Sequence, residues 1–196
     1  MKALQGDLIA QSGVSLKKTS SFPSYFNYGI ATGYQLKSNL EIGITYRYFS
    51  TGGRADYSDY SGHARIDQLL RANAVGVYTS KPINESTKWP LVIGVNISRI
   101  YTTADIETSL RLGNDNIDSN TVTLKGNGWG FYGCVMLQRY FTNKVFAFGK
   151  LGIEALANKN LQFNDNDTNL KADWSGPRVA LGLGFSLTPK NSTDQP

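Results

Sequence analysis

The chain has very little cysteine and histidine and no long apolar run. Its single cysteine, Cys134, excludes an intramolecular disulfide and is expected to be a buried thiol. No run of about 18 apolar residues is present, which excludes a transmembrane helix. The 20 Lys and Arg residues are scattered, so the net charge of +5 does not indicate a nucleic-acid partner. The 196 residues are enough for one domain of roughly 150–200 residues.

What the chain does contain is alternation of side-chain size. Between Phe22 and Ser50, large apolar residues take the even positions and small or polar residues the odd ones, with a turn at residues 37–39. A period of two is typical of strands with two different faces. The large residues here are Phe26, Tyr28, Ile30, Tyr34, Leu36, Leu40, Ile42, Ile44, Tyr46 and Tyr48. This stretch therefore predicts a β-hairpin with one large apolar face.

The same pattern recurs and predicts an all-β fold, a closed antiparallel up-and-down transmembrane barrel of eight strands. The expected strands cover residues 2–16, 24–36, 40–50, 66–79, 89–101, 128–141, 145–156 and 171–187. Short periplasmic turns are expected at 37–39, 81–88 and 142–144, and longer external loops at 51–65, 102–127 and 158–170. Parts of 102–127 alternate, so the two strands beside it are expected to continue past the membrane as a hairpin that turns near residues 113–116. The barrel would occupy residues 1–187, followed by a polar, disordered tail at 188–196.

The composition of the two faces favours a membrane over water. Small and polar residues suit the lumen of a narrow barrel, and large apolar residues suit lipid. The rival interpretation is a soluble lipocalin-like, ligand-binding barrel with the large face inward. In strand 66–79 we expect Leu70, Ala72 and Ala74 outward, because that phase leaves Arg71 inside. The expected lipid-facing belt includes Leu8, Ile30, Ile42, Ile44, Ile93, Val135, Leu151, Leu181 and Leu183.

Three stretches carry a resemblance to a known family. They are GlnGlyAsp at 5–7, TyrGlnLeuLysSerAsnLeuGluIleGly at 34–43 and ValAlaLeuGlyLeuGlyPheSerLeu at 179–187. The chain resembles small OmpA- and OmpX-type barrels, the outer membrane protein β-barrel domains common in Bacteroidetes. The resemblance implies a bacterial outer-membrane location with both termini periplasmic. Because no signal peptide begins the sequence, we expect a mature chain.

Charged side chains are expected inside the barrel. By phase, the inward set is Asp7, Glu41, Arg47, Arg71, Lys150, Glu154 and Arg178. A charge in a narrow lumen must be paired or hydrated, so we predict a plug of salt bridges, with a narrow or gated pore as the alternative. Specifically, Glu154 should lie opposite Arg178 and contact it, with Arg47 or Arg71 as the alternative donor.

The function favoured by the sequence is non-enzymatic. The resemblance implies a structural, adhesion or accessory interaction protein in outer-membrane lipid, binding other outer-membrane proteins through loops 51–65, 102–127 and 158–170. No catalytic residue, metal or cofactor is expected. The alternative is a lipid-modifying enzyme that uses His63, beside Ser58, Asp59 and Ser61, at the outer rim.

Overall fold

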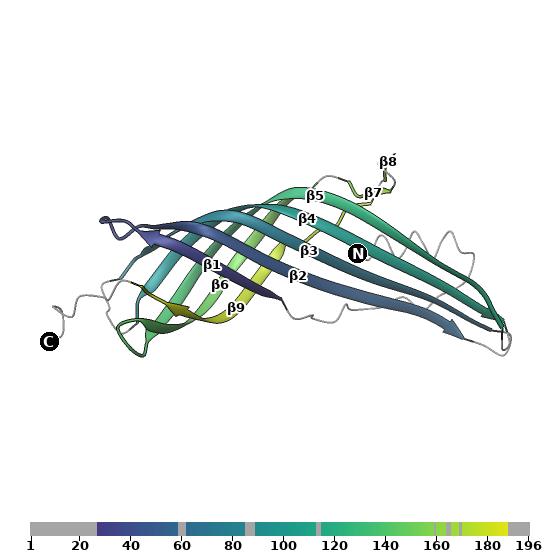
Figure 1. The fold of residues 1–196 in the computed structure, drawn as a ribbon, viewed down its shortest axis with the longest axis horizontal. Coiled ribbons are helices and arrows are strands. Elements are labelled where there is room, and N and C mark those ends of the chain that lie inside the picture. The colour runs from purple at the N-terminus through teal and green to yellow at the C-terminus, as the bar shows by residue number, and fades with distance from the viewer. Residues whose placement is uncertain are drawn as a thin grey trace.

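The computed structural model describes residues 27–58, 62–84, 89–112, 115–158, 160–163, 166–168 and 170–187. The strands are β1 (Tyr28–Gln35), β2 (Glu41–Ser58), β3 (Gly62–Pro82), β4 (Leu91–Leu112), β5 (Asp115–Tyr140), β6 (Val145–Asn158), β7 (Gln162–Phe163), β8 (Asn166–Asp167) and β9 (Gly176–Phe185). They form one antiparallel sheet in the order β1-β2-β3-β4-β5-β6-β9, with the short β7 and β8 at the side of β5. This seven-strand path curls into a half-barrel (Figure 1).

The predicted all-β, antiparallel, up-and-down architecture is confirmed for these ranges. The expected strand at 2–16 and the tail at 188–196 lie outside the described residues. Within the described chain, β1 pairs only with β2, and β9 pairs only with β6. Each of these two strands therefore has one edge without a described partner, and closure into a barrel is not part of the described fold.

The strands β2 to β5 are longer than predicted. A loop was expected at 51–65, and this was wrong, because β2 and β3 stay paired as far as Ser58 and His63. The hairpin expected within 102–127 is confirmed, with pairing as far as Leu112 and Asp115. These four strands extend well past β1, β6 and β9 (Figure 1). We call this projection the extension; it consists of residues 49–58, 62–72, 102–112 and 115–126.

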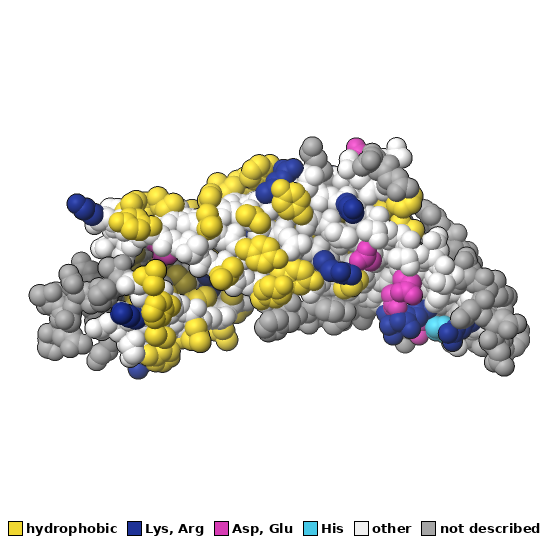
Figure 2. All heavy atoms as spheres, viewed as in Figure 1, with side chains coloured by type: hydrophobic (Ala, Val, Ile, Leu, Met, Phe, Trp, Pro, Cys, Tyr) yellow, Lys and Arg dark blue, Asp and Glu magenta, His cyan; other side chains and the backbone are white. Residues whose placement is uncertain are grey.

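The large apolar residues lie on the outer face of the curled sheet, as predicted. Leu181 is 86% exposed and Ile30 is 72% exposed. The predicted belt residues within the described chain are all exposed: Ile30, Ile42, Ile44, Ile93, Val135, Leu151, Leu181 and Leu183. Figure 2 shows apolar side chains gathered over the half-barrel, whereas charged side chains are prominent on the extension. A lipocalin-like barrel would bury this set inside, and the structure does not.

The phase predicted for β3 was wrong. Leu70, Ala72 and Ala74 are buried on the inner face, and Val75 and Val77 are exposed on the outer face. The expectation was based on keeping an arginine inside the barrel. That reason fails because Arg71 lies beyond the apolar belt on the outer face, where its guanidinium reaches Asp105 on β4.

The apolar core lines the inner face of the extension and of the adjoining part of the half-barrel. Its buried residues are Phe49, Ala55, Ile66, Leu70, Ala72, Ala74, Ile100, Ala104, Ile106, Leu124, Leu161, Ala172 and Trp174. Leu161, Ala172 and Trp174 come from the connection between β6 and β9, which folds over the inner face. Trp174 Nε1 donates a hydrogen bond to Thr102 Oγ1 at 3.2 Å, which fixes this connection against β4.

Two glycines on adjacent strands differ in how closely they are packed. A Cβ at Gly152, on the inner face of β6, would meet the Gly133 carbonyl and lie 2.7 Å from the Tyr132 ring. A Cβ at Gly133, on the outer face of β5, would meet nothing within 4 Å. We expect Gly152→Ala to lower the free energy of unfolding by about 1–3 kcal/mol, because the backbone carbonyl cannot move aside. The matched Gly133→Ala should leave the urea midpoint in detergent micelles unchanged, and equal midpoints for both variants would contradict this packing.

Candidate functional site

A fully buried carboxylate organises the interior of the half-barrel. Glu154 lies on the inner face of β6 with none of its side chain exposed. Arg47 Nη2 on β2 lies 2.7 Å from Glu154 Oε1, and Arg178 Nε on β9 lies 3.2 Å from Oε2. The predicted contact between Glu154 and Arg178 is present, and the alternative donor Arg47 binds the same carboxylate. The predicted register was wrong by two residues, because Glu154 faces Gly176.

Other polar groups hold the two guanidinium groups in place. Arg47 Nη2 also donates to Asn96 Oδ1 at 3.3 Å and to Ser98 Oγ at 3.1 Å, both on β4. Arg178 Nη2 donates to the carbonyl oxygen of Trp174 at 2.5 Å. The cluster thereby ties β2, β4, β6 and β9 together across the concave side of the sheet. Arg47 Nε is one of four buried side-chain polar atoms without a hydrogen-bond partner in the described structure; the others are Gln68 Nε2, Gln68 Oε1 and Thr79 Oγ1.

Aromatic rings separate the interior cations. The Phe49 ring lies 4.8 Å from Arg178 Cζ and 5.2 Å from Arg47 Cζ. The Tyr132 ring lies 5.2 Å from Arg47 Cζ and 5.9 Å from Lys150 Nζ. Cation–π attraction stabilises such contacts most when water is excluded. The alternation of cations and rings therefore fills the interior: two guanidinium groups bind one carboxylate, and the Tyr132 ring lies between Arg47 and Lys150.

The other predicted inward charges divide into three cases. Glu41 is inward but separate, accepting hydrogen bonds from the hydroxyls of Tyr78 and Ser80. Arg71 was predicted inward and is on the outer face, 2.9 Å from Asp105. Asp7 lies outside the described residues. The structure thus brings together Arg47, Glu154 and Arg178, with Lys150 joined to them through the Tyr132 ring.

A second charge cluster, on the outer face of the extension, was not predicted. Asp67 on β3 accepts hydrogen bonds from Arg54 Nε at 2.6 Å and from Arg65 Nε at 2.7 Å. Asp105 on β4 binds Arg71 and accepts a hydrogen bond from the Thr123 hydroxyl at 2.8 Å. The signal in the sequence was opposite charge at positions that face each other once β2 and β3 continue as strands, as at Arg54 and Asp67.

This outer cluster predicts a pH dependence. Burial raises the pKa of Asp67, but hydrogen bonds and charges from Arg54 and Arg65 outweigh it and bring the pKa below 3.8. A carboxylate with a lowered folded-state pKa contributes stability above its unfolded pKa, and loses it as pH falls through the folded value. We therefore expect wild type to exceed Asp67→Asn in unfolding free energy at about pH 6, with the gap closing as pH falls through the lowered folded-state pKa of Asp67. Urea titrations across this range measure the gap, and a gap independent of pH would contradict the assignment.

The residues of the enzymatic alternative do not form a described catalytic arrangement. His63 faces Ser58 across the tip of the β2–β3 hairpin, while Asp59 and Ser61 lie outside the described residues. In the ranges the structure describes, no group of three metal-ligating side chains occurs. No helix in those ranges is long and apolar enough to cross a bilayer.

Comparison with known proteins returned no match. No family model, curated protein or solved structure is significantly similar to this chain. A functional proposal therefore depends on the two faces of the sheet, the interior charge cluster and the extension.

Proposed function

We propose that this protein is an eight-stranded outer-membrane barrel that acts without catalysis, as a structural, adhesion or accessory interaction protein. The observation that carries this proposal is the exposed apolar belt on the outer face. Soluble monomers rarely expose a contiguous apolar patch of more than a few hundred Å². A surface of this kind is favourable in contact with lipid acyl chains.

The belt is continuous from strand to strand. Register pairs place Ile44 beside Val77, Val77 beside Ile97, and Ile97 beside Phe131. Toward the β9 edge of the sheet, Leu151 pairs with Val179 on the same outer face. The charges inside the half-barrel are neutralised or stacked on rings, so the polar interior and apolar exterior are reversed relative to a soluble barrel.

Closure would come from residues 2–16. Their alternation predicts a strand, and β1 and β9 each offer one edge with no described partner. An open edge inside a bilayer is costly because its backbone groups have no water to bind.

Disulfide cross-linking tests the pairing of residues 2–16 with β9. In a Cys134→Ser background, Leu8→Cys is combined in turn with Val179→Cys, Leu181→Cys or Leu183→Cys. Efficient cross-linking of one pair, with Leu8→Cys and Val95→Cys as the negative control, is the expected result.

The extension would make the protein contacts. Its paired strands and its core give a rigid support that reaches beyond the belt, and recognition is commonly located on such supported segments. The buried Glu154 cluster fits a closed interior and a structural role better than an open passage. Replacing residues 54–67 with a two-residue turn, which keeps Gly53 opposite Gln68, should abolish partner co-purification from native membranes while leaving the protein in the membrane fraction.

The membrane proposal is tested by flotation with phospholipid vesicles followed by trypsin treatment. We expect the protein to float, with cleavage in the extension, at Arg65 or Lys125, and protection of Lys150. The same protein in detergent micelles is the control for intrinsic cleavability. A protein that stays soluble and monodisperse without detergent, and does not float, would refute the proposal.

A further inference from the structure

We propose that the turn end of the half-barrel binds the headgroups of anionic phospholipids through Lys37, Lys81, Arg139 and Lys144. This inference depends on the proposed membrane location and adds the class of lipid that the protein selects. All four side chains are exposed. We call them the turn-end cations.

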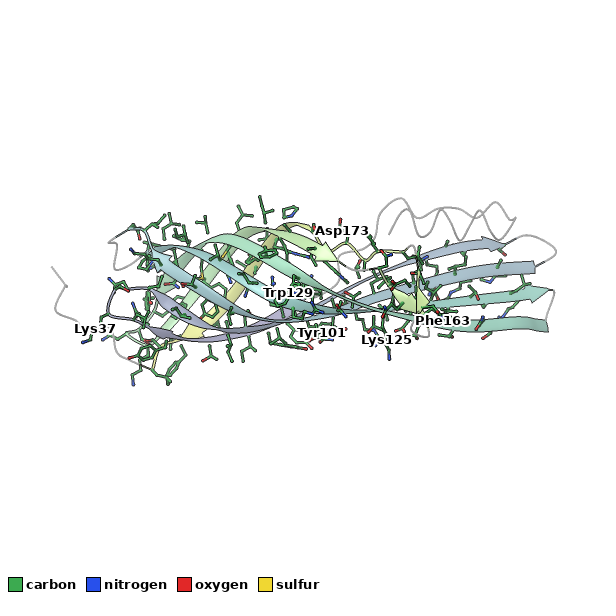
Figure 3. All side chains as sticks on the ribbon, turned by 90° about the horizontal axis from the view of Figure 1, so that it is seen from above. Lys37, Tyr101, Lys125, Trp129, Phe163 and Asp173 are labelled. Carbon is green, nitrogen blue, oxygen red and sulfur yellow. The ribbon has the colours of Figure 1, made fainter. Side chains whose placement is uncertain are left out.

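The fold gathers these residues at one end of the sheet. Lys37 lies in the turn between β1 and β2, Lys81 at the end of β3, Arg139 at the end of β5, and Lys144 in the turn between β5 and β6. They therefore span the sheet from β1 to β6 at a single level. Figure 3 places Lys37 at this end, and Trp129 and Lys125 toward the extension.

The cations at the two ends of the belt differ in their ion pairing. On the extension, Arg54 and Arg65 bind Asp67, and Arg71 binds Asp105. None of the turn-end cations takes part in an ion pair within the described ranges. The nearby carboxylate of Glu41 points inward, to Tyr78 and Ser80. With respect to the described carboxylates, the turn-end cations are therefore available to anions from outside the protein.

The turn-end cations border the apolar belt directly. Lys81 is in register with the exposed Ile93, and Arg139 Cζ lies 4.5 Å from the centre of the Trp89 ring. Tyr34 adds another exposed ring, 74% accessible, near Lys37. A phospholipid presents an anionic phosphate next to acyl chains, and so matches cations placed next to an apolar surface. A nucleic acid or an acidic peptide would match the charges but not the belt.

Tryptophan quenching by brominated lipids tests this inference. Trp89 reports on the turn end and Trp129 on the opposite edge, so single-tryptophan variants are made by replacing the other two tryptophans with phenylalanine. Each is placed in vesicles carrying brominated phosphatidylglycerol or brominated phosphatidylcholine at equal mole fraction. We expect phosphatidylglycerol to quench Trp89 more strongly than phosphatidylcholine does, with no such preference at Trp129.

Charge removal identifies the source of the preference. The triple variant Lys37→Gln, Lys81→Gln, Lys144→Gln keeps Arg139 beside the reporter and should lower the preference at Trp89 at least about fivefold at low salt. The matched control Arg54→Gln, Arg65→Gln, Lys125→Gln removes the same number of charges from the other end and should leave the lipid preference at Trp89 unchanged.

The possible outcomes separate the headgroup inference from the membrane proposal. Equal quenching of Trp89 by both lipids, or a preference that survives the triple variant, would overturn the headgroup inference alone. Absence of quenching by either lipid at both tryptophans would instead refute the membrane location. A preference abolished by inorganic phosphate, but not by chloride of equal ionic strength, would assign the site to free phosphate and overturn the lipid assignment.

Discussion

Replacing Glu154 with alanine should lower the free energy of unfolding by about 3–5 kcal/mol. The carboxylate is fully buried between Arg47 and Arg178, whose side chains are only 17% and 25% exposed. Its removal leaves two guanidinium groups in the interior without their counter-charge. The measurement is a urea titration of the protein in phospholipid vesicles.

A neutral core provides the control for this variant. The triple variant Arg47→Met, Glu154→Leu, Arg178→Met removes all three charges together, and should recover most of the lost stability because no charge remains unpaired. A Glu154→Ala midpoint equal to that of wild type would show that the cluster is hydrated rather than buried. Conductance in planar bilayers tests whether this cluster closes the interior. Sustained conductance by the wild-type protein would contradict a closed interior.

An arginine in the centre of the belt should be costly in lipid. Leu181 is 86% exposed and pairs with Gly149 midway along β9, so Leu181→Arg should lower the unfolding free energy in vesicles by about 2–4 kcal/mol. Leu187 is equally exposed but follows the end of β9, near the expected headgroups. Leu187→Arg should therefore cost about 0–1 kcal/mol.

The comparison between these two positions separates lipid from water. A soluble protein would tolerate arginine equally at both, since surface substitutions usually change stability by less than about 0.5 kcal/mol. Small and equal effects at Leu181 and Leu187 would therefore contradict a membrane-embedded belt.

Alternation predicted the two faces of the sheet where one face was uniformly large. At Ile42 and Ile44, or at Leu181 and Leu183, the period of two left no other choice of outer face. In β3 it failed, because apolar residues occupy both phases at Leu69 and Leu70, and the placement of Arg71 decided the outcome wrongly. Alternation indicates which face of the sheet a charged side chain is on. It does not indicate whether that side chain lies within the apolar belt or beyond its edge.

The extension and the exact partners of Glu154 could not be predicted from the sequence, because they depend on how neighbouring strands pair with each other. Residues 51–65 are rich in Gly and polar groups and predicted a loop, yet the ion pair of Arg54 with Asp67 joins facing strands there. The predicted pairing of Glu154 with Arg178 corresponds to a symmetric hairpin whose midpoint is residue 166. The chain instead folds inward through Leu161 and Trp174 before β9 begins, which shifts the pairing by two residues.

The order of pairing has a consequence for how the sheet assembles. Each of the long strands β1 to β6 pairs with its neighbours in the chain, so the sheet can grow hairpin by hairpin with little loop-closure entropy at each step. The proposed joint between residues 2–16 and β9 is different, because it brings together segments separated by nearly the whole chain. Until residues 2–16 pair with both of them, the apolar strands β1 and β9 each present a row of unpaired backbone groups, which is a template for aggregation with a second copy. Newly synthesised chains should therefore need a holding chaperone or rapid insertion most during this last step.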